Sequence, residues 1–172
     1  MFRQGFRAFL SALDQIGMVC HRIAKFLLVV MGVAMAVIIL LQVLFRFSIK
    51  IPFPWSEELA RYLMVWIGMM GASIAMQEGR HVGVDILVDR LHGRAQSLVR
   101  GMALIGILWF LGLMVREGIQ LMLQIAEQRS PAMDIPMVFP YGAIPLGAFF
   151  MIVEGLRAFF RLLCGLDEPK VR

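Results

Sequence analysis

The chain has 172 residues, of which 60% are hydrophobic and 17% are charged, whereas a soluble domain carries about 25% charged residues. This composition excludes an ordinary soluble protein and predicts an integral membrane protein. Nearly all of the basic residues behind the formal net charge of +5 lie outside the apolar runs, in the two tails and the loops. It therefore indicates membrane topology and needs no nucleic acid to explain it.

The first 24 residues are predicted to form an amphipathic helix. Basic and apolar residues fall on different faces of this helix, and the apolar ones recur at alternating spacings of four and three: Phe2, Phe6, Phe9, Leu13, Ile16, Cys20 and Ile23. The pattern favours a helix that lies along the inner membrane face with its basic residues towards anionic headgroups. A soluble coiled-coil seam is the alternative, although only three heptads are present.

Four apolar runs follow, at approximately 26–46, 55–77, 101–123 and 135–156. A helix rises about 1.5 Å per residue, so about 20 residues cross the ~30 Å hydrocarbon core. No run shows the alternation of an outer-membrane barrel strand. We therefore expect one membrane domain over residues 1–172, with four transmembrane helices and an all-α fold. Apolar residues between 84 and 98 also line one face, which predicts a second interfacial helix in the middle loop.

Basic residues predict the orientation. Twelve lie in the two tails and the middle loop, and four lie in the other two loops, so both termini are expected in the cytoplasm. The first run is too long for the apolar part of a signal peptide and should remain as an anchor. Cys20 and Cys164 then lie on the cytoplasmic side, where a structural disulfide is not expected.

The second span begins with charged residues next to two prolines and a tryptophan. Small residues share one helical arc with these charges, and the arc holds Glu57, Glu58, Arg61, Val65, Gly68, Ala72 and Ala75. Because small residues let another helix approach closely, we expect this face to pack against protein, with Glu57 and Arg61 paired at i,i+4. The alternative is that Arg61 snorkels to the interface and that Trp55 and Tyr62 are belt aromatics.

A polar stripe continues the third span. It comprises Arg116, Glu117, Gln120, Gln124, Glu127 and Gln128. The apolar run 101–115 is too short to cross alone, so Arg116 and Glu117 are expected inside the outer leaflet edge or its interface. The stripe could contact a larger partner, pack within the bundle or meet water.

The histidines do not indicate a metal or haem site. His21, His81 and His92 map to cytoplasmic membrane edges, whereas axial haem ligands lie inside spans, which speaks against a redox-chain anchor. His81 and Asp85 stand at i,i+4, but two ligands without a third make a weak site. We expect His81 to form a cap or hydrogen bond at the end of the second span. No catalytic arrangement is present, so neither an enzyme nor a bound cofactor is expected.

A recognisable set of residues comes from the first, second and fourth predicted spans and the middle loop: Gln42 and Val43 with Arg46, the run Pro54–Arg61, Trp66, Gly71 and Ala72, His81 and Val82, Ile135 and Pro136, and Tyr141–Gly147 with Pro145. This set resembles the small membrane subunit of tripartite ATP-independent periplasmic (TRAP) transporters, the DctQ-like family. The resemblance covers nearly the whole chain.

The resemblance implies a non-catalytic subunit in the bacterial inner membrane. In TRAP systems a periplasmic substrate-binding protein captures an organic acid, and a large multi-span permease subunit moves it with sodium. The resemblance implies that the small subunit acts as a scaffold for the large one and helps to dock the periplasmic protein. Its partners are thus these two proteins and membrane lipid, and the implied sodium belongs to the large subunit.

We expect a set of residues from the charged helix start and the family motifs to serve the partner interface or the structure. The set is Gln42, Arg46, Trp55, Glu57, Glu58, Arg61, Tyr62, Trp66, Gly68, Gly71, Ala72, His81, Arg116, Glu117, Tyr141 and Pro145. The alternative function is an independent small four-helix transporter that acts as a homodimer. That function requires an acid within a span, typically the first, and residues 26–45 contain none.

Overall fold

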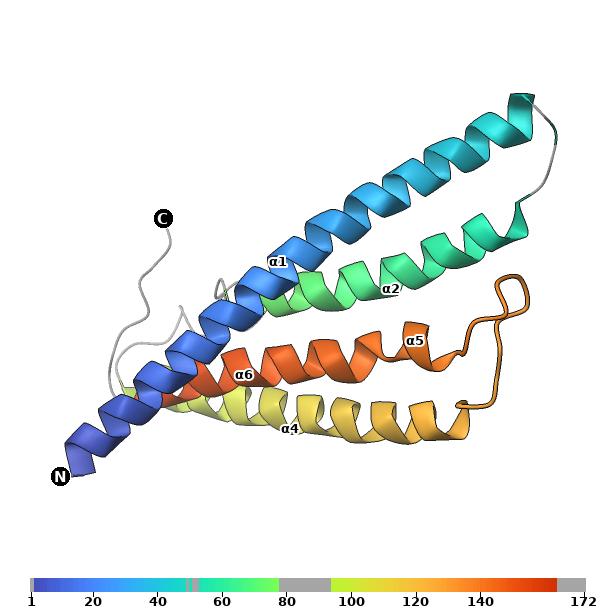
Figure 1. The fold of residues 1–172 in the computed structure, drawn as a ribbon. Coiled ribbons are helices and arrows are strands. Elements are labelled where there is room, and N and C mark those ends of the chain that lie inside the picture. The colour runs from blue at the N-terminus through green and yellow to red at the C-terminus, as the bar shows by residue number, and fades with distance from the viewer. Residues whose placement is uncertain (1, 49, 51–52, 78–93, 164–172) are drawn as a thin grey trace.

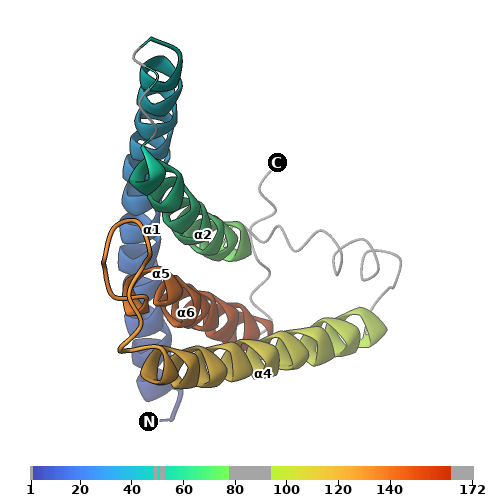
Figure 2. The same cartoon turned by 90° about the vertical axis from the view of Figure 1, so that its right-hand side faces the viewer.

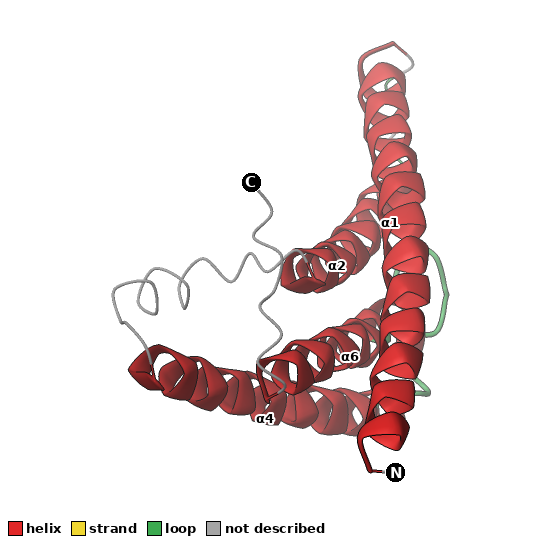
Figure 3. Cartoon of the chain, turned by 90° about the vertical axis from the view of Figure 1, so that its left-hand side faces the viewer, coloured by secondary structure: helices red, strands yellow, loops and turns green. Residues whose placement is uncertain are grey.

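The structure is a computed structural model that describes residues 2–48, 50, 53–77 and 94–163. Every element within these residues is a helix (Figure 3). The elements are α1 (Phe2–Ser48), α2 (Pro54–Gln77), α4 (Arg94–Gln124), α5 (Val138–Tyr141) and α6 (Ala143–Leu163). Most of the predicted interfacial helix in the middle loop, and His81 with it, lies outside the described residues.

Four helices are long and apolar enough to cross a membrane, so the predicted fold class is confirmed. Their bounds differ from the predicted runs. Helix α1 is continuous over 47 residues, so the predicted surface helix 1–24 joins the first span without a break, and its place at the membrane surface stays a prediction. Pro145 lies in the first turn of α6, where proline is tolerated because that N–H has no partner within the helix.

The helices form an open row rather than a closed bundle. Helices α2, α6 and α4 lie side by side in that order, and α1 runs obliquely along the row (Figures 1 and 2). Among the described residues α1 contacts α2 and α6 but not α4, and α4 contacts no other long helix than α6. We call the end where α1 finishes, α2 begins and loop 125–137 lies the loop end, and the end where α1 begins and α6 finishes the terminal end.

Helix α6 holds the row together through small residues. Ala143 and Ala148 are fully buried, and a Cβ added to Gly147 would lie 2.6 Å from the Met69 Cβ of α2. Close backbone approach of this kind needs glycine or alanine at the crossing. On the α4 side, a Cβ on Gly118 would lie 3.1 Å from Pro145 Cδ, so each neighbour meets α6 at a defined height.

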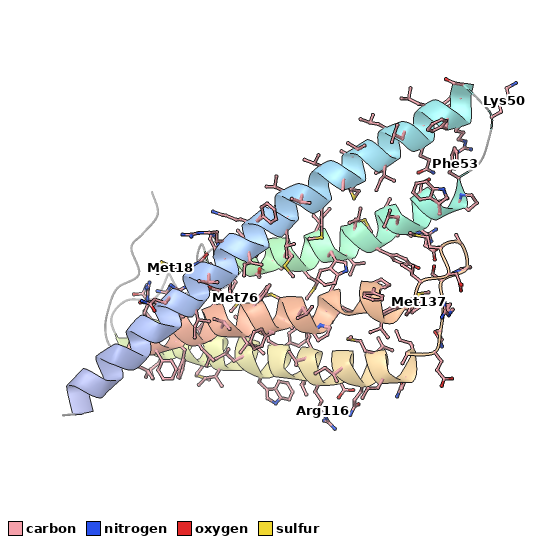
Figure 4. All side chains as sticks on the ribbon, viewed as in Figure 1. Met18, Lys50, Phe53, Met76, Arg116 and Met137 are labelled. Atoms are coloured by element: carbon pink, nitrogen blue, oxygen red, sulfur yellow. The ribbon has the colours of Figure 1, made fainter. Side chains whose placement is uncertain are left out.

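The outward faces of α1, α2 and α4 are largely apolar (Figure 4). In α1 the exposed side chains include Val29, Val33, Leu40 and Leu44. An apolar surface of this extent marks contact with a membrane or another protein. The four hydropathic helices make this chain a multi-pass membrane protein.

The crossing of α2 and α6 predicts a clear difference between two glycine variants. Gly147→Ala places a methyl group against Met69, whereas Gly68→Ala meets no atom within 4 Å. Both substitutions raise the helix propensity by the same amount. The difference in stability between the two variants therefore measures the steric overlap of the new methyl group with Met69. We expect Gly147→Ala to cost about 1–3 kcal/mol and to lower the melting temperature in detergent, with Gly68→Ala neutral or stabilising. Equal melting temperatures would show that the helices do not approach so closely.

Candidate functional site

Glu58, in the first turn of α2, is the anchor of the loop end. Its side chain is 8% exposed, and its two oxygens accept three hydrogen bonds. The Tyr62 hydroxyl donates to Oε1 at 2.5 Å, and the backbone N–H groups of Ala132 and Met133 donate to Oε2 at 3.0 and 3.1 Å. Hydrogen bonds to an ionised carboxylate are stronger than neutral ones. A single side chain of α2 therefore fastens the loop between α4 and α5.

The loop is also bonded internally. Arg129 Nη1 donates to the backbone oxygen of Asp134 at 3.1 Å and to its Oδ2 at 3.3 Å. Ser130 Oγ accepts the N–H of Met133 at 3.2 Å, and the N–H of Asp134 donates to the Ser130 carbonyl. Asp134 has a positive φ of 53°, a conformation that aspartate tolerates better than most residues. The loop is thus a compact turn that α2 holds in place.

The aromatic residues at the loop end join segments of this chain. The Trp66 indole N–H donates to the Phe139 carbonyl at 3.2 Å, which ties α2 to α5. The Trp55 ring lies edge-on to Phe53 at 6.1 Å, and Phe53 lies edge-on to Phe45 of α1 at 5.1 Å. These contacts support the structural part of the role expected for Trp55 and Trp66.

The structure divides the charged helix start into two parts. Glu57 and Arg61 form the predicted i,i+4 ion pair at 3.6 Å, and both side chains are about two thirds exposed, at 67% and 69%. Glu58 instead turns towards the loop and is bonded within the chain. Of the three charges, only the Glu57–Arg61 pair faces outward and is available to a partner.

The other expected interface residues are dispersed. Gly68 and Ala72 are on an open face of α2, and their packing against protein stays a prediction. Gly71 instead faces α1, where its Cβ position lies 3.4 Å from Leu28. On α1, Gln42 is half-buried and Arg46 is exposed, and on α4 both Arg116 and Glu117 are exposed. Tyr141 is exposed, whereas Pro145 is buried beside α4.

A second ionic cluster, at the terminal end, was not expected from the sequence. Arg157 of α6 is buried and donates from Nη1 to Glu154 Oε2 at 2.7 Å and from Nε to Asp14 Oδ1 at 3.1 Å. Arg161 donates to the same Asp14 oxygen at 3.0 Å. A Cβ at Gly17 would overlap the Arg157 guanidinium, so a larger residue there would displace this side chain from its ionic contacts.

The signal for this cluster was present on α6. Glu154, Arg157 and Arg161 stand at i, i+3 and i+7, which puts them on one helical face. The apolar run predicts a span that ends near residue 156, which leaves both arginines in the C-terminal tail. The structure continues α6 to Leu163, so these charges lie within the helix and pair with α1.

The contacts of Glu58 at the loop end and those of Arg157 at the terminal end stabilise the fold. Their charges are bonded to each other and to backbone groups, which binds helices and loop together. Within the described residues, no three metal-ligating side chains come together.

The comparison with protein families decides the identity. The family described as the DctQ component of tripartite ATP-independent periplasmic transporters matches residues 35–165, which is most of the chain. This chain belongs to the DctQ family. It is therefore a TRAP small permease and a transporter subunit, which is not a catalytic enzyme class.

Three relatives illustrate the range of the family. The small permease is 32% identical over 108 residues to the C4-dicarboxylate TRAP transporter small permease protein DctQ of Rhodobacter capsulatus, covering 62% of this chain and 48% of that protein. It is 27% identical over 146 residues to the sialic acid TRAP transporter small permease protein SiaQ of Vibrio cholerae, covering 84% of each. The isethionate TRAP transporter permease protein DctMQ of Oleidesulfovibrio alaskensis is 29% identical over 60% of this chain but only 16% of its own length.

The anchor role of Glu58 can be tested in the small permease with its exposed neighbour as control. Glu58→Gln replaces the charged carboxylate, which accepts hydrogen bonds from the N–H groups of Ala132 and Met133, with a neutral amide. A hydrogen bond to a charged group contributes about 1.5–3 kcal/mol, so amide exchange in residues 130–134 should become roughly ten to a hundred times faster. Glu57→Gln should leave that exchange unchanged. Equal exchange in the two variants would contradict the anchor role.

Proposed function

We propose that this chain is the non-catalytic small subunit of a TRAP-type secondary transporter and scaffolds the large sodium-coupled permease subunit. It helps to dock the periplasmic substrate-binding protein during uptake of an organic acid. It lies in the bacterial inner membrane with both termini in the cytoplasm. The observation that carries this proposal is the match to DctMQ, in which the counterpart of this chain is a small part of a much longer permease protein.

The distribution of polar groups supports a scaffold role. Within the described residues the buried charged side chains gather at the two ends of the row: Glu58 at the loop end, and Glu154 and Arg157 at the terminal end. Between them Ser73 is buried, and its hydroxyl donates to the Met70 carbonyl of its own helix at 2.8 Å. Solute and ion sites of transporters are built from polar groups near the midplane. Within the described residues no buried charge lies between the two ends, and the Arg116–Glu117 pair is exposed on the outward face of α4, so we assign substrate handling to the large subunit.

The loop end supports the docking part of the proposal. With both termini in the cytoplasm, this end faces the periplasm. Loop 125–137 is exposed along most of its length, yet Glu58 and the Arg129–Asp134 pair hold its shape. A preorganised surface loses less conformational entropy when a partner binds. The exposed Glu57–Arg61 pair lies beside it on α2.

The relatives support an organic acid as the solute. They are named for C4-dicarboxylates, sialic acid and isethionate, all of which are organic anions. Sodium coupling rests on the family resemblance and is assigned to the large subunit.

The proposal predicts a stable complex. When a tagged form is co-expressed with its large permease and extracted in mild detergent, the two subunits should be recovered in equal amounts. Recovery only as a monomer or homodimer would reject the scaffold role, and the homodimer would favour an independent small transporter.

Arg61 should contribute to this complex or to transport. Arg61→Ala removes an exposed cation, and we expect a several-fold loss of complex yield or of solute uptake, because charges at an interface guide and orient association. Arg22→Ala, at an exposed position of α1 near the terminal end, serves as the control. Unchanged yield and uptake in Arg61→Ala would exclude Arg61 from the interface.

A further inference from the structure

Arg116 and Glu117 of α4 form an ion pair at 3.7 Å whose side chains are 68% and 61% exposed. Helix α4 turns Leu111 and Gly118, seven residues apart, towards α6. The ion pair therefore lies on a face of α4 that no other part of the described chain covers. In Figure 4 the Arg116 side chain points away from the row.

Contacts with α6 fix the height of this pair. Gly118 meets Pro145, and two residues further along α6 Gly147 meets Met69 of α2. Because α4 runs opposite to α6, Arg116, two residues before Gly118, is level with Gly147 and hence with Met69. A second contact, of Gly155 with both Leu108 and Met76, gives the same register.

Met69 is at the middle of the apolar part of α2. It stands eight residues from Arg61 and eight from Gln77, the last residue of α2, or about 12 Å from each. The Arg116–Glu117 pair is therefore near mid-height in the row. Side chains lean towards the N-terminus of their helix, which for α4 is the terminal end, so Arg116 leans away from the nearer loop end.

Lipid is a poor neighbour for such a pair. Ionised side chains within the hydrocarbon core are costly, and they face protein or a water-filled cavity. The same face of α4 also presents Gly106 and Gly112, with no atom within 4 Å of their Cβ positions, so another backbone can approach closely. The exposed side chains of α1 over the same heights are bulky and apolar, which suits lipid.

We propose that the uncovered face of α4 is the surface on which the large permease subunit docks within the membrane. This surface comprises Trp109, Gly112, Arg116, Glu117 and Gln120. Its occupant is a transmembrane helix of the large subunit that carries a polar or charged side chain at mid-membrane depth, opposite the ion pair. The inference rests on the proposed function and names the face through which that function is exercised.

Photo-crosslinking in the co-expressed complex tests the contact. A photoreactive residue at position 112 or 120 should crosslink to the large subunit, and one at position 33 or 40 of α1 should crosslink to lipid. If the subunits co-purify but positions 112 and 120 yield no crosslink to the large subunit, the docking face is wrong while the proposed function stands. Crosslinks to a second copy of this chain would overturn the inference in favour of self-association.

Two glycines provide matched variants. Gly112→Leu on α4 and Gly32→Leu on α1 both place a Cβ where no atom lies within 4 Å and both gain helix propensity, so neither should lower the melting temperature. Gly112→Leu should reduce recovery of the complex at least tenfold, because the partner backbone can no longer approach. Gly32→Leu should leave recovery unchanged. Equal recovery of the two variants would overturn the inference.

Removal of the charges gives an independent readout. Arg116→Leu leaves Glu117 unpaired in a buried interface and should reduce complex recovery at least tenfold. Arg116→Leu with Glu117→Leu leaves no unpaired charge and should lose less. If neither variant changes recovery, the pair faces lipid or water and the docking face is elsewhere.

Discussion

The close approach of helix backbones around α6 is the constraint on which the rest of the structure depends. Gly147 admits Met69 of α2, and Pro145 sits against Gly118 of α4, so both neighbours are set at fixed heights on α6. Without a hydrophobic effect between helices in lipid, packing of this kind carries much of their association. An open row follows, because α6 lies between α2 and α4 and leaves their far faces uncovered.

Ionic contacts join neighbouring elements at the two ends of the row, the loop end and the terminal end. At the loop end Glu58 binds loop 125–137 to α2, and at the terminal end Arg157 joins α6 to Asp14 of α1. A buried charge is tolerated when its partners satisfy it, and removal of one partner is strongly destabilising. The ionic contacts at both ends and the close packing between them hold α6 in a fixed position, as a scaffold requires. Helices α1 and α4 have exposed faces that can contact lipid and a partner.

The sequence predicted the helices well because the apolar runs match the thickness of a bilayer. It also predicted the Glu57–Arg61 pair, since both residues lie on one helix at i,i+4. It did not predict that Glu58 turns inward, because helical periodicity places a residue on a face but does not say which segment covers that face. The partners of Glu58, Ala132 and Met133, come from a loop more than 70 residues away.

The terminal cluster was missed because its residues are far apart in the sequence. Asp14 and Arg157 are 143 residues apart, and nothing local to either indicates the other. The apolar run of the last span stops at Val153, but paired charges let the helix continue to Leu163. The height of Arg116 depends on how α4 registers against α6, which no single helix encodes.

The register of α4 against α6 sets the height of the outward face of α4, and the depth of Ile119 in a bilayer reports that height. Ile119 is exposed on α4, one residue from Gly118, whereas Phe47 is exposed in the last turn of α1. With the chain alone in vesicles, a nitroxide at position 119 should collide often with oxygen and rarely with a water-soluble nickel chelate. A nitroxide at position 47 should show the reverse. Equal access of the nickel chelate to both positions would contradict the register of α4 against α6 and the mid-membrane height of the Arg116–Glu117 pair.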